Sequence, residues 1–274
     1  MAIAVEIFRE RPPALERARE FLEADPVANN VFLTLLNLPD SRRVESRYVV
    51  ACEEDSVVGV LFQSPVTFMA TITAMTGRVV EAVVRAVAAE PPGLPSVVGE
   101  AGSAALLAGQ WTETTKSAAV PDQGQRVYEV SEVNPPSGVQ GEFRRAEESD
   151  GALITDWLVA FGRRVGEPVH SPDEVATRRI AAGEFWLWDH NGAVSMAAMT
   201  QAVAGVARVQ AVFTPEDLRG RGFASACVAS LSNLVLDSGS RCILYTELGN
   251  PISNSVYRRI GYRAVSEIVR YKFS

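Results

Sequence analysis

Residues 209–224 constrain the fold most, because they predict a strand, a turn and the start of a helix in direct succession. The run 209–213 is rich in β-branched and apolar residues, and Pro215 ends the strand because proline cannot donate a hydrogen bond to a sheet. Two residues of the turn 219–222 are glycines, which have no side chain to keep a ligand from the backbone. The apolar run 223–236 that follows predicts a helix. A strand followed at once by a helix indicates an α/β domain.

A helix N-terminus that follows glycines can bind an anion. Its first N–H groups have no partner within the helix, and the helix dipole places positive charge there. Arg219 and Arg221 flank the glycines and add charge. The turn lacks the Gly-Lys-Ser/Thr of a P-loop, and Gly220-Arg221-Gly222 lacks the third glycine of a dinucleotide-binding fingerprint. The segment therefore predicts a phosphate or pyrophosphate site of another class, with an ordinary tight strand-to-helix connection as the alternative.

Two motifs occur in order in the second half of the chain. Arg219, Gly222 and Ala224 occupy the three fixed places of an Arg/Gln-x-x-Gly-x-Gly/Ala pattern. A strand over 241–247, the segment 250–254 and a short helix then follow at a plausible separation. In both motifs the chain resembles the GNAT superfamily of acyl-CoA-dependent N-acyltransferases. Two motifs in the right order are far more specific than either motif alone.

The resemblance implies a mixed α/β (α+β) fold built in tandem. Proline and glycine at 133–138 predict a linker between a first domain over 1–133 and a second over 139–274. The second half shows the strand and helix order that the family requires, including a final strand at 264–273. The first half repeats this order in outline, which favours a degenerate GNAT-like domain over an unrelated α/β domain. Its counterpart of the turn, 75–80, has one glycine, so we expect one acyl-CoA site per chain, in the second half.

Composition excludes some partners. The chain has 274 residues and a net charge of −7, with 18 acidic and 11 basic residues in 1–138. This acidic balance argues against a nucleic-acid partner. No stretch has the pattern of a membrane span or a signal peptide, and the three cysteines lack metal-ligand spacing. We therefore expect a cytoplasmic protein with no metal site and no membrane partner.

The resemblance assigns an acyl-CoA site residue by residue, with acetyl-CoA as the family's commonest donor. A bulge after the strand would free backbone N–H groups at 212–214 for the pantetheine arm and the thioester oxygen. The pyrophosphate would bind the amides of 218–224, with the two arginines as charge partners. The asparagines at 250 and 254 would contact the pantetheine arm or cap the helix that follows. The expected cofactor-binding residues are Val212, Phe213, Thr214, Arg219, Gly220, Arg221, Gly222, Phe223, Ala224, Asn250 and Asn254.

Candidate catalytic residues are fewer. Tyr257 stands where the family has a tyrosine that acts as general acid toward the leaving thiolate, and a phenol with a pKa of about 10 is protonated at neutral pH. The alternative for Tyr257 is a tyrosine packed in the core. Glu247 is the best-placed carboxylate for a general base, although the sequence does not identify the base. Glu167 and His170 lie in a loop that often shapes the acceptor pocket of the family.

Three functions remain open. The leading one transfers an acetyl or short acyl group from acyl-CoA to the primary amine of a small molecule or peptide, by direct attack. A non-catalytic module that senses acyl-CoA would keep the turn but would not need Tyr257. Transfer from an aminoacyl-tRNA would need a basic surface, which the acidic first half argues against. The acceptor, the acyl length and the oligomeric state do not follow from the sequence, although the final strand could pair across a homodimer.

Overall fold

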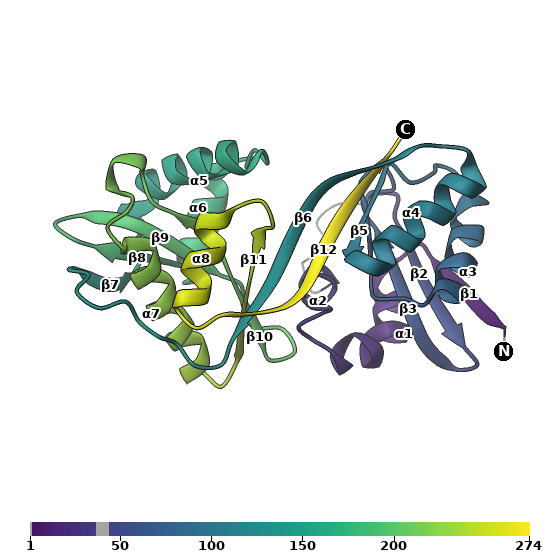
Figure 1. Ribbon diagram of the computed structural model, residues 1–274, viewed down its shortest axis with the longest axis horizontal. Coiled ribbons are helices and arrows are strands. Elements are labelled where there is room, and N and C mark those ends of the chain that lie inside the picture. The colour runs from purple at the N-terminus through teal and green to yellow at the C-terminus, as the bar shows by residue number, and fades with distance from the viewer. Residues whose placement is uncertain (1, 37–43) are drawn as a thin grey trace. The chain divides into compact units, whose positions relative to one another are not determined.

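The computed structural model describes residues 2–36 and 44–274. They form a mixed α/β fold in which eight α-helices flank twelve strands (Figure 1). Internal contacts divide the chain into two units. The first contains Met1–Val127, Glu247–Gly249 and Ser266–Ser274, and the second contains Tyr128–Thr246 and Asn250–Val265. The last nine residues of the chain therefore belong to the first unit.

The first unit is built on strands in the order β1-β2-β3-β4-β5-β12-β6, in which β12 spans Arg263–Phe273 and β6 spans Ala119–Val130. Strands β1 to β4 are antiparallel neighbours, whereas β4 and β5 are parallel. Five valines of α3 lie on one face of the helix, because they recur at spacings of three and four residues, and this face packs in the apolar core of the unit. Its elements are β1 (Ile3–Phe8), α1 (Arg11–Ala24), α2 (Asn30–Leu36), β2 (Arg47–Glu53), β3 (Ser56–Gln63), β4 (Ala70–Ile72), α3 (Gly77–Ala88), β5 (Ser96–Glu100) and α4 (Ala101–Thr115).

The second unit has the strand order β6-β11-β10-β9-β8-β7. Here β7 to β10 are antiparallel neighbours, and β10 and β11 are parallel. Its elements are β7 (Glu142–Arg145), η1 (Glu148–Asp150), α5 (Gly151–Val165), α6 (Pro172–Ala181), β8 (Phe185–Asp189), β9 (Ala193–Met199), β10 (Val206–Phe213), η2 (Glu216–Leu218), α7 (Phe223–Asp237), β11 (Arg241–Glu247) and α8 (Pro251–Arg259). Strands β6 (Ala119–Val130) and β12 (Arg263–Phe273) contribute residues to both units.

The two units repeat one plan, which confirms the predicted tandem α/β fold. Each has four antiparallel strands, a parallel pair, and one helix between the two strands of that pair. The final strand was expected in the second half, but its residues from Ser266 onward belong to the first unit, where Ile268–Lys272 pair with β5. Tyr271 and Phe273 pack there against the core, and the burial of these rings accounts for the placement. The end of β6 lies beside β11 in the second unit, where Glu129 pairs with Arg241.

Helices cover both faces of the sheet in the second unit. Ala207 and Val209 of β10 pack in one cluster with apolar residues of α7. Phe213, at the end of the same strand, packs on the opposite face, where its ring lies 5.9 Å from that of Trp157 in α5. Figure 1 shows α5 and α7 on different sides of these strands. The end of β10 is thus held between two helical layers.

Two smaller findings bear on function. Among the described helices, none combines the length and the apolar content that crossing a membrane requires. All three cysteines are buried free thiols. Burial raises the pKa of the Cys227 thiol, which therefore stays protonated and behaves as a small apolar group.

Candidate functional site

Strand β10 contains a bulge close to its end. Gln210 pairs with Ala198 of β9, three residues before Phe213. The partner of Phe213 is Met196, only two residues from Ala198, so β10 holds one extra residue between these pairs. Ala211 has a φ of +50° at this point, which is uncommon for a residue with a side chain. The bulge therefore lies within β10, between Gln210 and Phe213, whereas the resemblance placed it after the strand.

The pairing of β10 with β11 ends before the bulge. It runs from Val206, which pairs with Arg241, to Val209, which pairs with Leu244. In the described chain no further pairing joins these two strands, although β10 continues to Phe213. Backbone N–H and C=O groups of β10 after Val209 that point toward β11 are thus available to another partner.

A serine on β9 holds the end of β10. Ser195 is fully buried, and its Oγ donates a hydrogen bond to the carbonyl oxygen of Phe213 over 3.1 Å. The same Oγ lies 2.8 Å from Oγ1 of Thr214, which is also buried. Ser195 was not among the residues predicted from the sequence, although a polar residue in the middle of an otherwise apolar strand is a visible signal.

The two arginines of the turn bond to their own loop. Nε of Arg219 donates to the carbonyl oxygen of Thr214 over 3.0 Å, and its Nη1 pairs with Glu216 over 2.9 Å. Nη2 of Arg221 donates to the carbonyl oxygen of Asp217 over 3.1 Å. Both guanidinium groups therefore brace the connection between β10 and α7, and they add positive charge beside the N-terminus of α7.

The backbone amides of the turn are divided between two uses. The amide of Leu218 donates to Pro215 over 3.1 Å, and that of Arg219 donates to Glu216 over 3.3 Å, which closes the short helix η2. These two amides were expected to bind pyrophosphate but are already engaged within the loop. The amides that α7 leaves without an intrahelical partner are those of its first turn, beginning at Phe223.

Both glycines of the turn have conformations that favour glycine. Gly220 has a φ of +77° and Gly222 a φ of +84°. A side chain at Gly222 would also place its Cβ 2.9 Å from the Val139 side chain. Gly222 is the N-cap of α7, and within the described chain no side chain caps this helix end. The N-terminus of α7 is therefore a bare set of amide donors, as an anion site requires.

Tyr257 lies in the apolar cluster that joins α7 and α8. Its ring contacts those of Tyr128 and Tyr262, with centroids 6.4 Å and 6.0 Å away. Burial raises its pKa to about 12, so the phenol is protonated throughout the neutral range. The hydroxyl of Tyr262 bonds to Ser232 over 2.7 Å, whereas none of the described residues forms a hydrogen bond with the Tyr257 hydroxyl.

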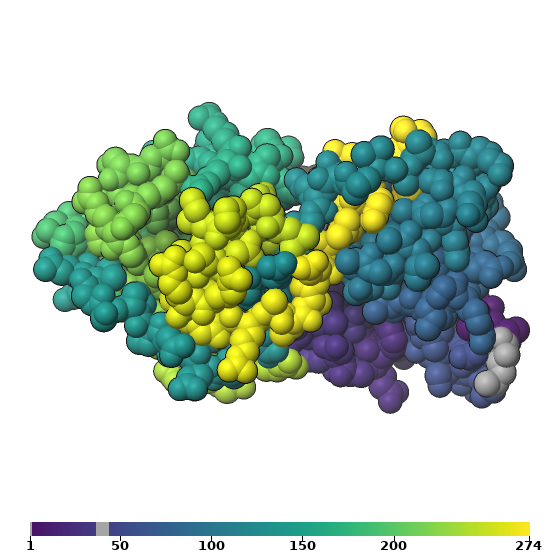
Figure 2. Space-filling model, in the orientation of Figure 1, coloured from purple at the N-terminus to yellow at the C-terminus, as the bar shows by residue number. Residues whose placement is uncertain are grey.

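The two predicted asparagines bind protein groups. The Asn250 side chain accepts a hydrogen bond from the amide of Ser253 over 3.0 Å and caps α8, which is the capping role foreseen for one of them. Asn254 is buried; its amide group donates to the Asn250 carbonyl over 2.7 Å and accepts from the Tyr128 hydroxyl over 2.9 Å. Both side chains shape the start of α8, which lies at the surface seen in Figure 2.

The candidate acid–base and acceptor residues are more dispersed. Glu247 is exposed at the end of β11 and belongs to the first unit, whereas Tyr257 belongs to the second. Glu167 and His170 are exposed on the connection between α5 and α6. The structure thus places Tyr257 and Phe223, the first residue of α7, in one apolar cluster, which contains none of Glu247, Glu167 and His170. The imidazole that packs against this cluster is that of His190, whose ring centroid lies 5.7 Å from that of Phe223.

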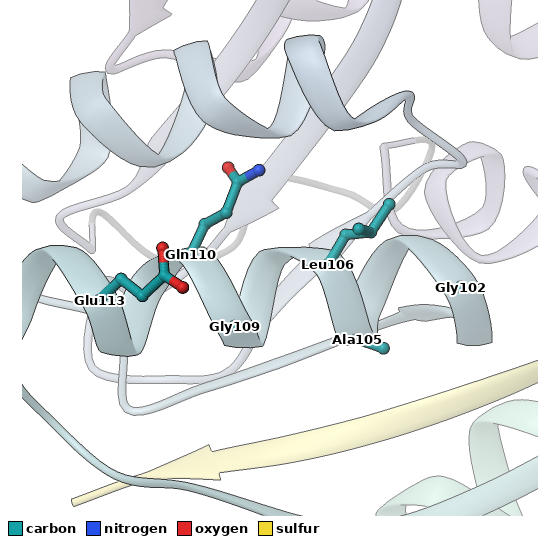
Figure 3. A pocket seen from close by; sticks show the side chains of 6 residues that line it. All are labelled: Gly102, Ala105, Leu106, Gly109, Gln110 and Glu113. Atoms are coloured by element: carbon teal, nitrogen blue, oxygen red, sulfur yellow. The ribbon is translucent and has the colours of Figure 1, made fainter.

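A hollow of about 460 Å³ lies elsewhere, along α4 of the first unit (Figure 3). Its lining carries one carboxylate, that of Glu113, and the amide of Gln110, which bonds to the first residue of α3 over 3.3 Å. It contains none of the predicted site residues. The residues that line it are Gly102, Ala105, Leu106, Gly109, Gln110 and Glu113.

Comparison with known proteins agrees with this architecture. Residues 190–271 match the family described as FR47-like protein. An acetyltransferase of the GNAT family from Colwellia psychrerythraea has the same fold, with a TM-score of 0.64 at 12% identity over 99% of this chain and 100% of that one. A GCN5-related N-acetyltransferase from Sphaerobacter thermophilus reaches 0.62 at 15% identity, over 98% of this chain and 94% of that one.

A tandem arrangement also has a solved counterpart. A tandem GNAT protein from the clavulanic acid biosynthesis pathway superposes with a TM-score of 0.59 at 11% identity, covering 99% of this chain and 98% of that chain. No curated protein matches the sequence. At these identities the likeness establishes the fold of both units.

Proposed function

We propose that this chain, which has the fold of the GNAT superfamily in a tandem arrangement, is an acyl-CoA-dependent N-acyltransferase with one working site, in its second unit. The observation that carries the proposal is the succession of three features along β10 and α7. A bulge, a stretch of strand without its parallel neighbour and an uncapped helix N-terminus follow one another within 209–225. Together they offer a line of backbone donors that fits an acyl group, a pantetheine arm and a pyrophosphate.

The donor groups suit an acyl thioester. The amides of the first turn of α7 would hold the pyrophosphate, and the positive φ of Gly220 and Gly222 turns the backbone into the helix. The backbone of Val212, Phe213 and Thr214 would meet the pantetheine arm and the thioester oxygen. Fixed N–H donors aimed at a developing oxyanion are worth roughly 2.7 to 4 kcal/mol in other acyl-transfer sites.

In the proposed reaction the nitrogen of a neutral primary amine attacks the thioester carbon. The C–N bond forms, the C–S bond breaks, and the leaving thiolate takes a proton. Tyr257 is the proposed donor of that proton, because its phenol stays protonated and packs in the same cluster as α7. The attacking nitrogen also loses a proton, for which Glu247 is the candidate base, whereas Glu167 and His170 are proposed to line the acceptor pocket.

The acceptor follows only as a class. We propose a small-molecule or peptide amine, and the acidic balance of residues 1–138 still argues against nucleic acid. A cytoplasmic location is part of the proposal, and the three buried free thiols are compatible with a reducing compartment. A homodimer remains a proposal, but not one formed through the final strand, because β12 already lies between β5 and β6.

Titration calorimetry of the purified protein with acetyl-CoA, and separately with CoA, tests the proposal. We expect one site per chain, followed in an amine screen by release of free thiol. Binding without turnover of any amine would favour the sensor module instead. If acetyl-CoA does not bind at all, the proposed donor is wrong and the acyltransferase proposal falls, while the fold remains.

A further inference from the structure

Ser195 is the one polar side chain within β9, and it is fully buried. A buried hydroxyl that makes no hydrogen bond destabilises the fold, so the partners of Ser195 indicate why this position is polar. Both partners lie beyond the bulge of β10: the Phe213 carbonyl at 3.1 Å and the Thr214 hydroxyl at 2.8 Å. Ser195 thus binds the end of β10, beyond the point at which β10 stops pairing with β11.

Proton counting fixes the direction of this network. A serine hydroxyl has one proton to donate. Ser195 gives that proton to the Phe213 carbonyl, so the contact with Thr214 must be a donation from the Thr214 hydroxyl to the Ser195 oxygen. The two hydroxyls therefore form a chain that ends on one backbone carbonyl.

That carbonyl sets the orientation of a backbone donor. The peptide bond between Phe213 and Thr214 is planar and trans, so the Thr214 N–H points opposite to the Phe213 carbonyl. Ser195 draws the carbonyl toward β9, which directs the N–H toward the other side of β10. Strand β11 lies on that side, but its pairing with β10 has already ended at Val209. The Thr214 N–H is therefore aimed at the gap between these strands.

The next peptide is held as well. Nε of Arg219 bonds to the Thr214 carbonyl over 3.0 Å, so Thr214 is fixed from β9 on one side and from the turn on the other. The position of the Thr214 N–H relative to the first turn of α7 thus depends on the contact with Ser195 and on the contact with Arg219.

We propose that Ser195 is a positioning residue for the acyl donor: its hydroxyl holds the Phe213–Thr214 peptide so that the Thr214 N–H meets the pantetheine arm or the acyl group. The inference rests on the proposed function, because that function supplies the ligand, acyl-CoA, that would lie between β10 and β11. It assigns Ser195 no contact with the donor and no part in proton transfer.

The test compares two ligands on Ser195→Ala. Calorimetry should show a loss of about fivefold to tenfold in affinity for acetyl-CoA, since one hydrogen bond is worth that much. The nucleotide half of CoA, which carries the pyrophosphate but no pantetheine arm, should keep its affinity within about twofold. Thr214→Val should give the same pattern, and the double variant should lose little more than either single one, because both hydroxyls act through one carbonyl.

Ser103→Ala is the matched control, because Ser103 is also buried and bonds to a backbone amide, that of Met75, but lies in the first unit. It should lower thermal stability without changing either affinity. Unchanged acetyl-CoA affinity in Ser195→Ala, or an equal loss for both ligands, would overturn the positioning role while leaving the proposed function intact. Failure of the unaltered protein to bind acetyl-CoA would instead remove the proposed function itself.

Discussion

At the scale of single residues, Gly222 meets two constraints at once. Its φ of +84° suits glycine, and a Cβ would lie 2.9 Å from Val139. Gly239 shares the first constraint, with a φ of +79°, but a Cβ there would meet nothing within 4 Å. Comparison of substitutions at Gly222 and Gly239 therefore distinguishes the strain of a left-handed conformation, which both share, from crowding at the proposed anion site, which only Gly222 has.

Gly222→Ala and Gly239→Ala should each lower the free energy of unfolding by about 1 to 2 kcal/mol, because an L-residue is strained at positive φ. Only Gly222→Ala should also weaken acetyl-CoA binding, by about tenfold or more. Calorimetry and thermal unfolding measure the two effects. Equal affinities in the two variants would remove the turn from the proposed site.

Tyr257→Phe should lower kcat by roughly a hundredfold, the loss typical of a missing general acid, while acetyl-CoA affinity stays within about twofold. Tyr262→Phe is the control, because Tyr262 is equally aromatic and buried but its hydroxyl bonds to Ser232. It should lose about 1 kcal/mol of stability and keep its turnover. Steady-state kinetics with the best amine from the screen decides, and a fully active Tyr257→Phe would assign the proton to another group.

The sequence could predict part of this site and not the rest. A glycine at a helix start and a tyrosine in a motif are visible in a linear pattern. The partners of Arg219 are not, because the contact between its guanidinium and the Thr214 carbonyl depends on how the turn closes. Ser195 was missed for the same reason, since it meets Thr214 only through the register that the bulge creates.

At the scale of elements, the two parallel pairs differ where a ligand would enter. In the second unit the pairing stops at Val209, before β10 ends. In the first unit β4 and β5 pair up to the last residue of β4, Ile72, and a Cβ on its partner Gly99 would lie 2.6 Å from the Ile72 carbonyl. Beyond β4, the Met75 amide is bonded to Ser103 of α4 over 3.0 Å. The first unit therefore has no comparable gap at this place.

This closure predicts one acetyl-CoA site per chain. Titration calorimetry of the unaltered protein should give a stoichiometry near one. Gly222→Ala should lower the affinity of that one site, and no second binding site should become detectable. A second site that persists in Gly222→Ala would show that the first unit binds the ligand in another way.

Most helices and strands could be predicted from their periodicity, but β4 and β6 could not. Strand β4 is three residues long, too short for an alternating pattern. Strand β6 contains Pro121, Asp122 and Gly124, which disfavour strands. It forms because its neighbours supply pairing and charge: Asp122 bonds to Arg270 over 2.6 Å and to Lys272 over 3.0 Å, both on β12.

At the scale of the whole molecule, neither unit is a continuous stretch of chain. Sequence patterns identify a final strand but not its neighbour, because alternation of side chains is the same whichever strand it pairs with. The structure pairs Ile268–Lys272 with β5, and the Phe273 ring lies 5.8 Å from that of Trp111 in α4. The first unit thus depends on the last residues of the chain for one strand of its sheet and part of its core.

Removing Ser266–Ser274 should therefore unfold or loosen the first unit, although the deletion lies at the opposite end of the sequence. Hydrogen exchange of the amides in β5 should accelerate strongly, since their β12 partners are gone. Phe273→Ala should cost about 1 to 2 kcal/mol through lost apolar burial, whereas Lys272→Ala, which removes an exposed ion pair, should stay within about 0.5 kcal/mol. If the truncated chain kept slow exchange in β5, the first unit would be stable without this strand, and its dependence on the C-terminus would be refuted.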